Sequence, residues 1–174
     1  PNLFKVSEML NIQNNVFFSR ERIGFDEMNI LYNISDFCLN ISYAEGFGLG
    51  TLESMMTGTP IIASKTGGLT RQVVNHRDGT ENGVALDIVS KTLVGSQSVP
   101  YIYEDYSSVE DAAKGMMKLY NMTPAQKENL SKKVLKYSLE EFKMEKTVDM
   151  WHETMIKTHE KWKKKYKRWN YMEL

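Results

Sequence analysis

Apolar residues follow two different spacings along this chain, and the two spacings alternate. Short, largely apolar runs are typical of strands buried on both faces; they lie at 15–19, 37–42, 61–64 and 83–88. Between them, apolar residues recur every three or four positions, as on one side of a helix; these segments are 26–33, 49–57 and 70–75. The alternation predicts an α/β fold with a Rossmann-like parallel sheet flanked by helices.

Turn residues indicate where some of these elements end. Gly58 follows the helix at 49–57, in the position where a left-handed residue costs least, and Pro60 prevents the helix from continuing. Residues 89–106 show no clear period and contain Gly, Ser and Pro. We therefore expect an inserted surface loop over 89–106.

Helices are predicted for the last third of the chain. Ser107 and Glu110 have the spacing of a capping box, and Thr123-Pro124-Ala125-Gln126 has the hydroxyl, proline and Gln of a second helix start. A long last helix is expected over about 146–171. Its aromatic stripe is too apolar to be left in water without a partner; the stripe consists of Val148, Trp151, Met155, Trp162, Tyr166 and Trp169.

Length and composition fit one packed domain with an appended helix. The chain has 174 residues, of which 41% are hydrophobic and 25% charged, which allows a real core. We expect residues 1–143 to form the Rossmann-like domain, truncated at its N-terminus, and residues 144–174 to form an amphipathic basic helix. The chain opens on Pro1 without an initiator Met, so we expect a fragment of a longer protein.

Charge and cysteine usage narrow the class of protein. The formal net charge is zero, so no global field attracts nucleic acid. The single cysteine, Cys38, cannot form an internal disulfide, and no segment is long and apolar enough to cross a membrane, which favours a cytoplasmic protein. Residues 157–168, however, contain seven Lys or Arg and one Glu. We interpret these basic residues as the solvated side of a helix that docks on a partner domain. Peripheral membrane contact through 157–168 is the alternative, and we expect no nucleic-acid partner.

A glycine-rich turn between two carboxylates carries the strongest sign of function. Glu45 and Glu53 are eight positions apart, and the turn that begins between them contains Gly46, Gly48 and Gly50. A strand, a glycine turn and a helix together aim unpaired N–H groups at an anion. Carboxylates instead accept hydrogen bonds from neutral hydroxyls, as on ribose or a sugar ring. A site for phosphate and hydroxyls together suggests a sugar nucleotide.

A second glycine turn, Gly67-Gly68, follows the next expected strand. In open parallel sheets, ligands bind at the carboxyl ends of the strands, where both glycine turns would lie. The alternative for both turns is backbone geometry alone, with Glu53 a solvated helix residue. The three histidines lack metal-ligand spacing, so we expect no metal site; they are His76, His152 and His159.

These residues resemble the C-terminal, donor-binding half of a GT-B fold retaining glycosyltransferase of the family 4 type, within the group 1 glycosyltransferases. That type is marked by two Glu separated by seven residues. The resemblance is dense over 15–88, fades through the expected loop and resumes over 107–142. Its residues are Leu31-Tyr32, Ser35-Asp36, Glu45-Gly46-Phe47-Gly48-Leu49, Leu52-Glu53, Gly58-Thr59-Pro60-Ile61-Ile62-Ala63-Ser64 and Gly67-Gly68.

The resemblance implies transfer of a sugar, of the hexosyltransferase type, from a nucleotide-diphosphate sugar with retention at the anomeric carbon and without an essential metal or other cofactor. It places Glu45 at donor-sugar hydroxyls near the reacting centre, as the catalytic position, and Glu53 on the ribose. The donor-binding residues it implies are Gly46, Phe47, Gly48, Leu49, Gly50, Thr51, Glu53, Gly67, Gly68 and, near the base, Arg20. The acceptor, a glycan, lipid or protein, would be held through an N-terminal domain.

The chain also departs from the family pattern. Gly50 stands where many relatives have Pro, and the family's Arg and Lys pair for the diphosphate lies upstream of where this chain begins. We therefore expect this chain alone to be inactive. In the family the final helix crosses back to the N-terminal domain, so the exposed stripe should cause self-association here. A non-catalytic nucleotide-sugar-binding module, or a membrane-associated module of the same fold, is the alternative function.

Overall fold

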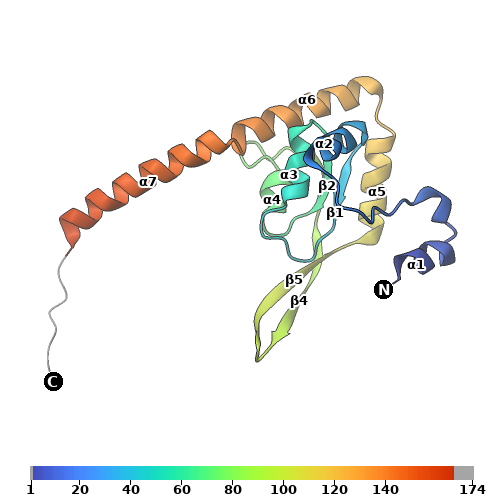
Figure 1. Cartoon of the computed structure of the whole chain (residues 1–174), viewed down its shortest axis with the longest axis horizontal. Helices are drawn as coiled ribbons and strands as arrows, with labels where there is room; N and C mark the ends of the chain where they lie inside the picture. Colours follow the sequence, from blue (N-terminus) through green and yellow to red (C-terminus); the bar gives the residue numbers. More distant parts are fainter. Residues whose placement is uncertain (1, 167–174) are drawn as a thin grey trace.

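A three-stranded parallel sheet lies at the centre of the computed structural model, which describes residues 2–166 (Figure 1). Its strands are β1 (Cys38–Asn40), β2 (Ile61–Ser64) and β3 (Gly83–Leu86), in the spatial order β1-β2-β3. Cys38 is opposite Ile61, and Ile61 is opposite Gly83. The predicted parallel sheet is confirmed, although β1 and β3 are shorter than the apolar runs that indicated them.

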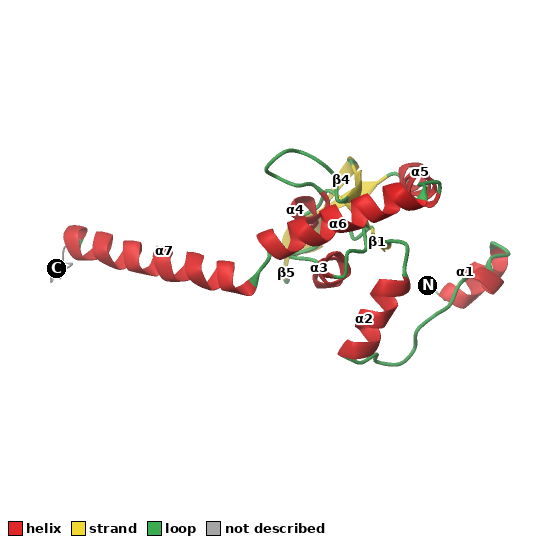
Figure 2. Cartoon of the chain, turned by 90° about the horizontal axis from the view of Figure 1, so that it is seen from above, coloured by secondary structure: helices red, strands yellow, loops and turns green. Residues whose placement is uncertain are grey.

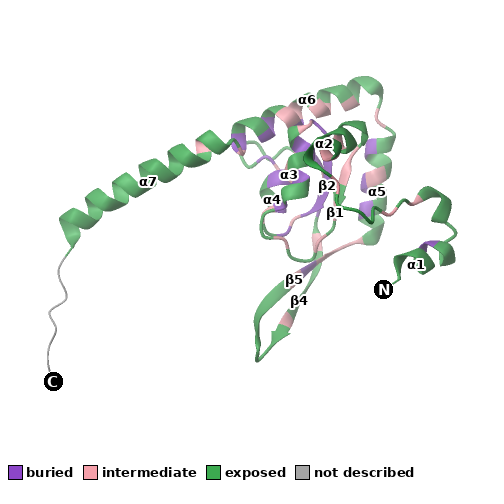
Figure 3. Ribbon diagram, in the orientation of Figure 1, coloured by how far each residue is buried: buried purple, intermediate pink, exposed green. Residues whose placement is uncertain are grey.

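Helices cover both faces of this sheet, as continuous apolar strands require. On one face, Ile61 and Ala63 pack with α3 (Leu49–Met56), α4 (Leu69–Val73) and α6 (Pro124–Glu141). On the other face, Ile62 and Leu86 pack with α5 (Val109–Tyr120). Figure 3 shows the buried segments gathered along β2, α3 and α4. The core therefore lies directly beneath the turns that follow β1 and β2.

The N-terminal region differs from expectation in one element. α1 (Leu3–Met9), η1 (Gln13–Asn15) and α2 (Phe25–Ile34) precede the sheet, and α2 confirms the helix predicted at 26–33. The strand predicted at 15–19 is wrong. Val16 is extended, but these residues pair with no strand in the described part of the chain. Instead, the Phe18 ring packs on Phe4, with centroids 4.4 Å apart.

The loop predicted over 89–106 is also wrong. β4 (Ile88–Ser96) and β5 (Val99–Ser107) form an antiparallel hairpin that extends away from the helices (Figure 1). Val, Thr, Ile and Tyr, which favour strands, make up half of the residues of the two segments together. Most of their side chains are exposed on both faces, so the sequence lacks the apolar–polar alternation that marks a half-buried strand.

Helix ends follow local capping chemistry, with one correction. Thr123 and Gln126 form the predicted capping box of α6, and Gly58 has φ +83° after α3. The predicted capping box of Ser107 with Glu110 is wrong: the N-cap of α5 is Ser108, whose hydroxyl accepts from the Asp111 N–H at 3.2 Å. The shift of one residue arises because Ser107 still belongs to β5.

The last helix, α7 (Met144–Lys165), projects away from the sheet, on the side opposite α1 (Figures 1 and 2). The stripe residues that the structure describes, from Val148 to Tyr166, are exposed. The helix was predicted to continue to about residue 171, but it ends at Lys165, and Tyr166 is its extended C-cap. Trp169 lies outside the described residues. Within residues 2–166, no helix combines the length and the apolar character that crossing a membrane requires.

Candidate functional site

The two glycine turns interlock at the carboxyl edge of the sheet. The Gly68 N–H donates to the Glu45 carbonyl at 3.2 Å. A Cβ on Gly67 would lie 1.9 Å from that same carbonyl oxygen, and a Cβ on Gly68 would lie 2.6 Å from the Phe47 Cα. Only glycine allows the two backbones to approach this closely. The structure thus brings together the two turns that the parallel topology predicted to be neighbours.

Glu45 lies within the first turn and is partly buried. Its Oε1 accepts from the N–H groups of Phe47 at 3.4 Å and Gly48 at 3.2 Å. Gly48, with φ +89°, is the N-cap of α3. The N–H groups of the first helical residues, from Leu49 onward, have no intrahelical acceptor and carry the positive end of the helix dipole. The turn therefore presents a carboxylate and N–H donors side by side.

The glycines of this turn have different surroundings. A Cβ on Gly48 would lie 2.5 Å from the Leu69 side chain, so packing requires a glycine there. At Gly46, an added Cβ would have no neighbour within 4 Å. Gly46 therefore leaves open space that the fold itself does not use.

A buried polar network that sequence reasoning missed holds the turn in place. The fully buried Gln72 amide donates to the carbonyls of Phe47 at 2.6 Å and Gly48 at 3.1 Å. The Thr51 hydroxyl lies 2.8 Å from the Gly48 carbonyl oxygen and also contacts the Gln72 side chain. Asn82, just before β3, donates to the Gln72 carbonyl at 2.8 Å. The Thr51 side chain thus supports the turn from inside. In the sequence, this network could have been suspected from Thr51 and Gln72, which are polar residues within two helical segments with an apolar side.

Glu53 lies further along α3 and faces α2. Its carboxylate accepts from the Tyr32 hydroxyl at 3.2 Å. Burial, followed by the charge and hydrogen bond of Glu53, raises the pKa of Tyr32 to about 12. A Cβ on Gly50 would approach the same hydroxyl to 3.4 Å. A cavity of about 250 Å³ adjoins this pair; its lining consists of Phe25, Met28, Asn29, Tyr32, Glu53, Met56 and Thr57.

Of the remaining predicted residues, Phe47 and Leu49 lie at the edge of this region, whereas Arg20 does not. Phe47 and Leu49 are exposed, and the Phe47 ring packs edge-on against Phe142, with centroids 6.1 Å apart. Arg20 is placed apart from the turns: its guanidinium lies 4.5 Å from the centroid of the Phe4 ring. The candidate site thus consists of the two turns and the Tyr32–Glu53 pair. Arg20 is not part of it, because it packs against the N-terminal helix α1.

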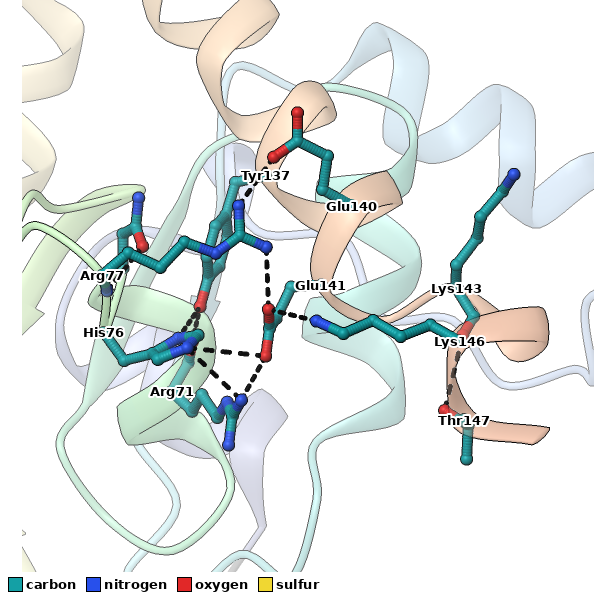
Figure 4. A network of polar contacts seen from close by, with 10 residues as sticks. Arg71, His76, Arg77, Tyr137, Glu140, Glu141, Lys143, Lys146 and Thr147 are labelled. Carbon is teal, nitrogen blue, oxygen red and sulfur yellow. Dashed lines mark hydrogen bonds and ion pairs between the residues drawn. The ribbon is translucent and has the colours of Figure 1, made fainter. Parts of the chain in front are cut away.

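A charge cluster next to this site ties α4, α6 and α7 together (Figure 4). Glu141, with only 3% of its side chain exposed, contacts Arg71 and lies 2.9 Å from Arg77 and 2.7 Å from Lys146. Burial acts to raise the pKa of Glu141, but hydrogen bonds from Lys146, Arg77 and Arg71 outweigh it and lower the pKa to about 2. Because Phe142 follows Glu141 and contacts Phe47, the cluster supports the first glycine turn.

The fold defines a Rossmann-like α/β domain, and its candidate site lies at the carboxyl ends of parallel strands and the N-terminus of a helix, where ligands bind in such folds. The chain belongs to the glycosyl transferases group 1 family, whose model matches residues 2–138. The predicted family is thereby confirmed. The structure is also similar to sucrose-phosphate synthase from Thermosynechococcus elongatus, with a TM-score of 0.64 and 21% sequence identity over 90% of this chain and 34% of that chain. This likeness confirms the predicted fold class, part of a GT-B fold.

Sequence relatives agree with the family. The chain is 28% identical over 138 residues to a D-inositol 3-phosphate glycosyltransferase from Corynebacterium urealyticum, covering 72% of this chain and 32% of the relative. It is 35% identical over 81 residues to the GDP-Man:Man(3)GlcNAc(2)-PP-Dol alpha-1,2-mannosyltransferase of Mus musculus, covering 47% of this chain and 16% of the relative. The chain thus spans less than a third of the length of these two relatives.

Proposed function

We propose that this chain is the donor-binding part of a retaining glycosyltransferase that transfers a sugar from a nucleotide-diphosphate sugar to an acceptor, without an essential metal. The N–H groups at the start of α3 would hold the diphosphate. Glu53 would accept hydrogen bonds from the ribose, and Glu45 from the donor sugar. One observation supports this assignment above the others: the Glu45 carboxylate and the N-terminus of α3 meet in one turn, in which a Cβ on Gly46 would have no neighbour within 4 Å.

The proposed mechanism is positional and electrostatic. N–H donors fixed before the reaction stabilise the charge that develops on the departing diphosphate. The Glu45 side chain is already oriented, because its Oε1 accepts both of its backbone hydrogen bonds. Its other oxygen, Oε2, can then accept a hydrogen bond from a sugar hydroxyl. Glu53 is oriented by the Tyr32 hydroxyl in the same way. The turn would therefore bind the donor with little reorganisation.

The proposal extends to the rest of the protein. Residues 1–143 would form the donor domain, and the aromatic stripe of α7 would dock on an acceptor-binding domain outside this chain. Without that domain we expect the chain to be inactive and to self-associate through the stripe. Peripheral membrane contact through 157–168 remains the competing explanation of the basic segment, and a cytoplasmic location remains a prediction.

Donor binding to the 174-residue chain tests the proposal. Because the mouse relative is named for a GDP-Man donor, calorimetry would use GDP-mannose together with UDP-sugars. Gly46→Ala should leave the unfolding free energy within about 0.5 kcal/mol, since the added methyl meets nothing, yet weaken donor binding about tenfold.

Two glutamates on helix surfaces give a matched control. Glu53→Ala should weaken donor binding, whereas Glu128→Ala, an exposed change on α6, should not. Donor affinity that is the same in wild type, Gly46→Ala and Glu53→Ala would refute the site, and absence of donor binding by the wild-type chain would refute the proposed function.

A further inference from the structure

The β4–β5 hairpin is anchored directly beside the glycine turns. The Asp105 N–H donates to the Tyr43 carbonyl at 2.7 Å, and the Tyr106 ring packs on the Tyr43 ring, with centroids 4.3 Å apart. Tyr43 precedes Glu45 by two residues. The base of the hairpin is thus fixed to the segment that carries Glu45, and the hairpin extends from there beyond the sheet (Figure 1).

One face of the hairpin starts at the site. Side chains two apart on a strand share a face, so Asp105, Tyr103 and Tyr101 lie in one row. Asp105 is buried at the base of that row, where the Lys91 ammonium at 2.9 Å and the Thr66 hydroxyl lower its pKa. Thr66 directly precedes the second glycine turn. Tyr103 and Tyr101 therefore follow about 7 Å and about 13 Å along the strand from a residue at the turns.

The exposed part of the hairpin has a distinct chemistry. Tyr101 is 63% exposed and Tyr103 is 64% exposed, and Leu93 lies opposite Tyr103 in the register. Residues 92–103 contain no Lys, Arg, His, Asp or Glu, but five hydroxyl side chains and one amide. Nucleic acid and anionic lipid are bound through Lys and Arg, so this surface fits neither. Exposed tyrosine side chains, each of which combines an apolar ring with a hydroxyl group, fit a neutral, polyhydroxylated ligand.

We propose that Tyr101 and Tyr103 form an acceptor platform, on which a neutral oligosaccharide acceptor stacks its sugar rings while its end reaches the donor sugar at Glu45. This inference rests on the proposed function, because the acceptor must approach the donor sugar for transfer to occur. It assigns part of the acceptor recognition to this chain.

Saturation-transfer NMR with the 174-residue chain tests the platform. The probes are malto-, manno-, cello- and xylo-oligosaccharides at millimolar concentration. Tyr101→Ser with Tyr103→Ser should weaken binding of the recognised series about tenfold. Tyr103→Phe keeps the ring and should bind within about twofold of the wild type. Ile102→Ser, a change of similar exposure on the opposite face, should bind as the wild type does and controls for damage to the hairpin.

Donor affinity is measured in the same samples, so the two proposals fail separately. The platform is supported if the tyrosine pair weakens oligosaccharide binding while donor affinity stays unchanged. It is overturned if donor binds but no oligosaccharide does, if Ile102→Ser weakens binding as much as the tyrosine pair, or if the tyrosines instead control self-association or binding to phosphatidylserine vesicles. If the wild-type chain does not bind the donor at all, the proposed function itself is overturned.

Discussion

The Glu141→Gln substitution should destabilise the domain, because Glu141 is a buried anion that three cations share (Figure 4). Gln keeps the shape of the side chain but removes the charge, leaving Arg71, Arg77 and Lys146 close together without their common partner. The loss should spread to the candidate site, because the cluster joins α4, which follows the second glycine turn, to the end of α6, where Phe142 contacts Phe47.

The pKa of Glu141 sets the expected size of this effect. Hydrogen bonds from the three cations more than offset burial and lower the pKa from 4.5 to about 2, which corresponds to about 3 kcal/mol of stability. Loss of one partner from a buried ion pair typically costs about 3–5 kcal/mol, in agreement with this value. Because the folded-state pKa is the lower one, the contribution is fully present above about pH 4.5 and is lost as the pH falls towards about 2.

Urea unfolding followed by circular dichroism measures the loss. At about pH 7, Glu141→Gln should cost about 3 kcal/mol, and its difference from the wild type should shrink as the pH falls below about 4.5. Glu140→Gln is the matched control. The Glu140 carboxylate is 45% exposed and lies 2.7 Å from Arg77, so its loss should cost less than about 1 kcal/mol. Equal effects of the two variants, or a Glu141→Gln effect independent of pH, would refute this reasoning.

Three further predictions test other parts of the structure. Glu53→Gln should lower the Tyr32 pKa from about 12 but leave it above its usual 10, because burial is the largest cause of the shift. NMR of labelled tyrosine measures this pKa, and an unchanged value would show that Glu53 does not interact with Tyr32. Gly68→Ala should cost about 3 kcal/mol in urea unfolding, because its methyl would meet the Phe47 backbone, whereas a neutral result would show that the turns do not interlock. Trp151→Ser with Trp162→Ser should reduce self-association in sedimentation velocity; an unchanged distribution would argue against the exposed stripe as its cause.

The sheet and its helices could be predicted because their residues are buried on regular spacings. The run at 61–64 became β2 with the same bounds, and Gly58 ended α3 as expected. The hairpin could not be predicted, because strands exposed on both faces lack an alternating pattern. The apolar run at 15–19 was misleading because a strand exists only with a partner, and local sequence does not specify one.

The site shows the same division between local and distant information. The meeting of the two glycine turns followed from parallel topology alone. The contacts of Gln72, Tyr32 and Glu141 depend on partners far along the chain, as for Arg71 and Glu141, which are 70 positions apart. The different surroundings of the site glycines could not be predicted either, because the sequence does not distinguish Gly48, which is packed against Leu69, from Gly46, which has open space beside it.

A crystal structure of this chain with a bound nucleotide-diphosphate sugar is the decisive test of the proposed donor site. We expect the diphosphate to lie against the N-terminus of α3 above Gly46, with Glu45 on the sugar and Glu53 on the ribose. A ligand bound elsewhere, with both carboxylates still facing solvent, would contradict it.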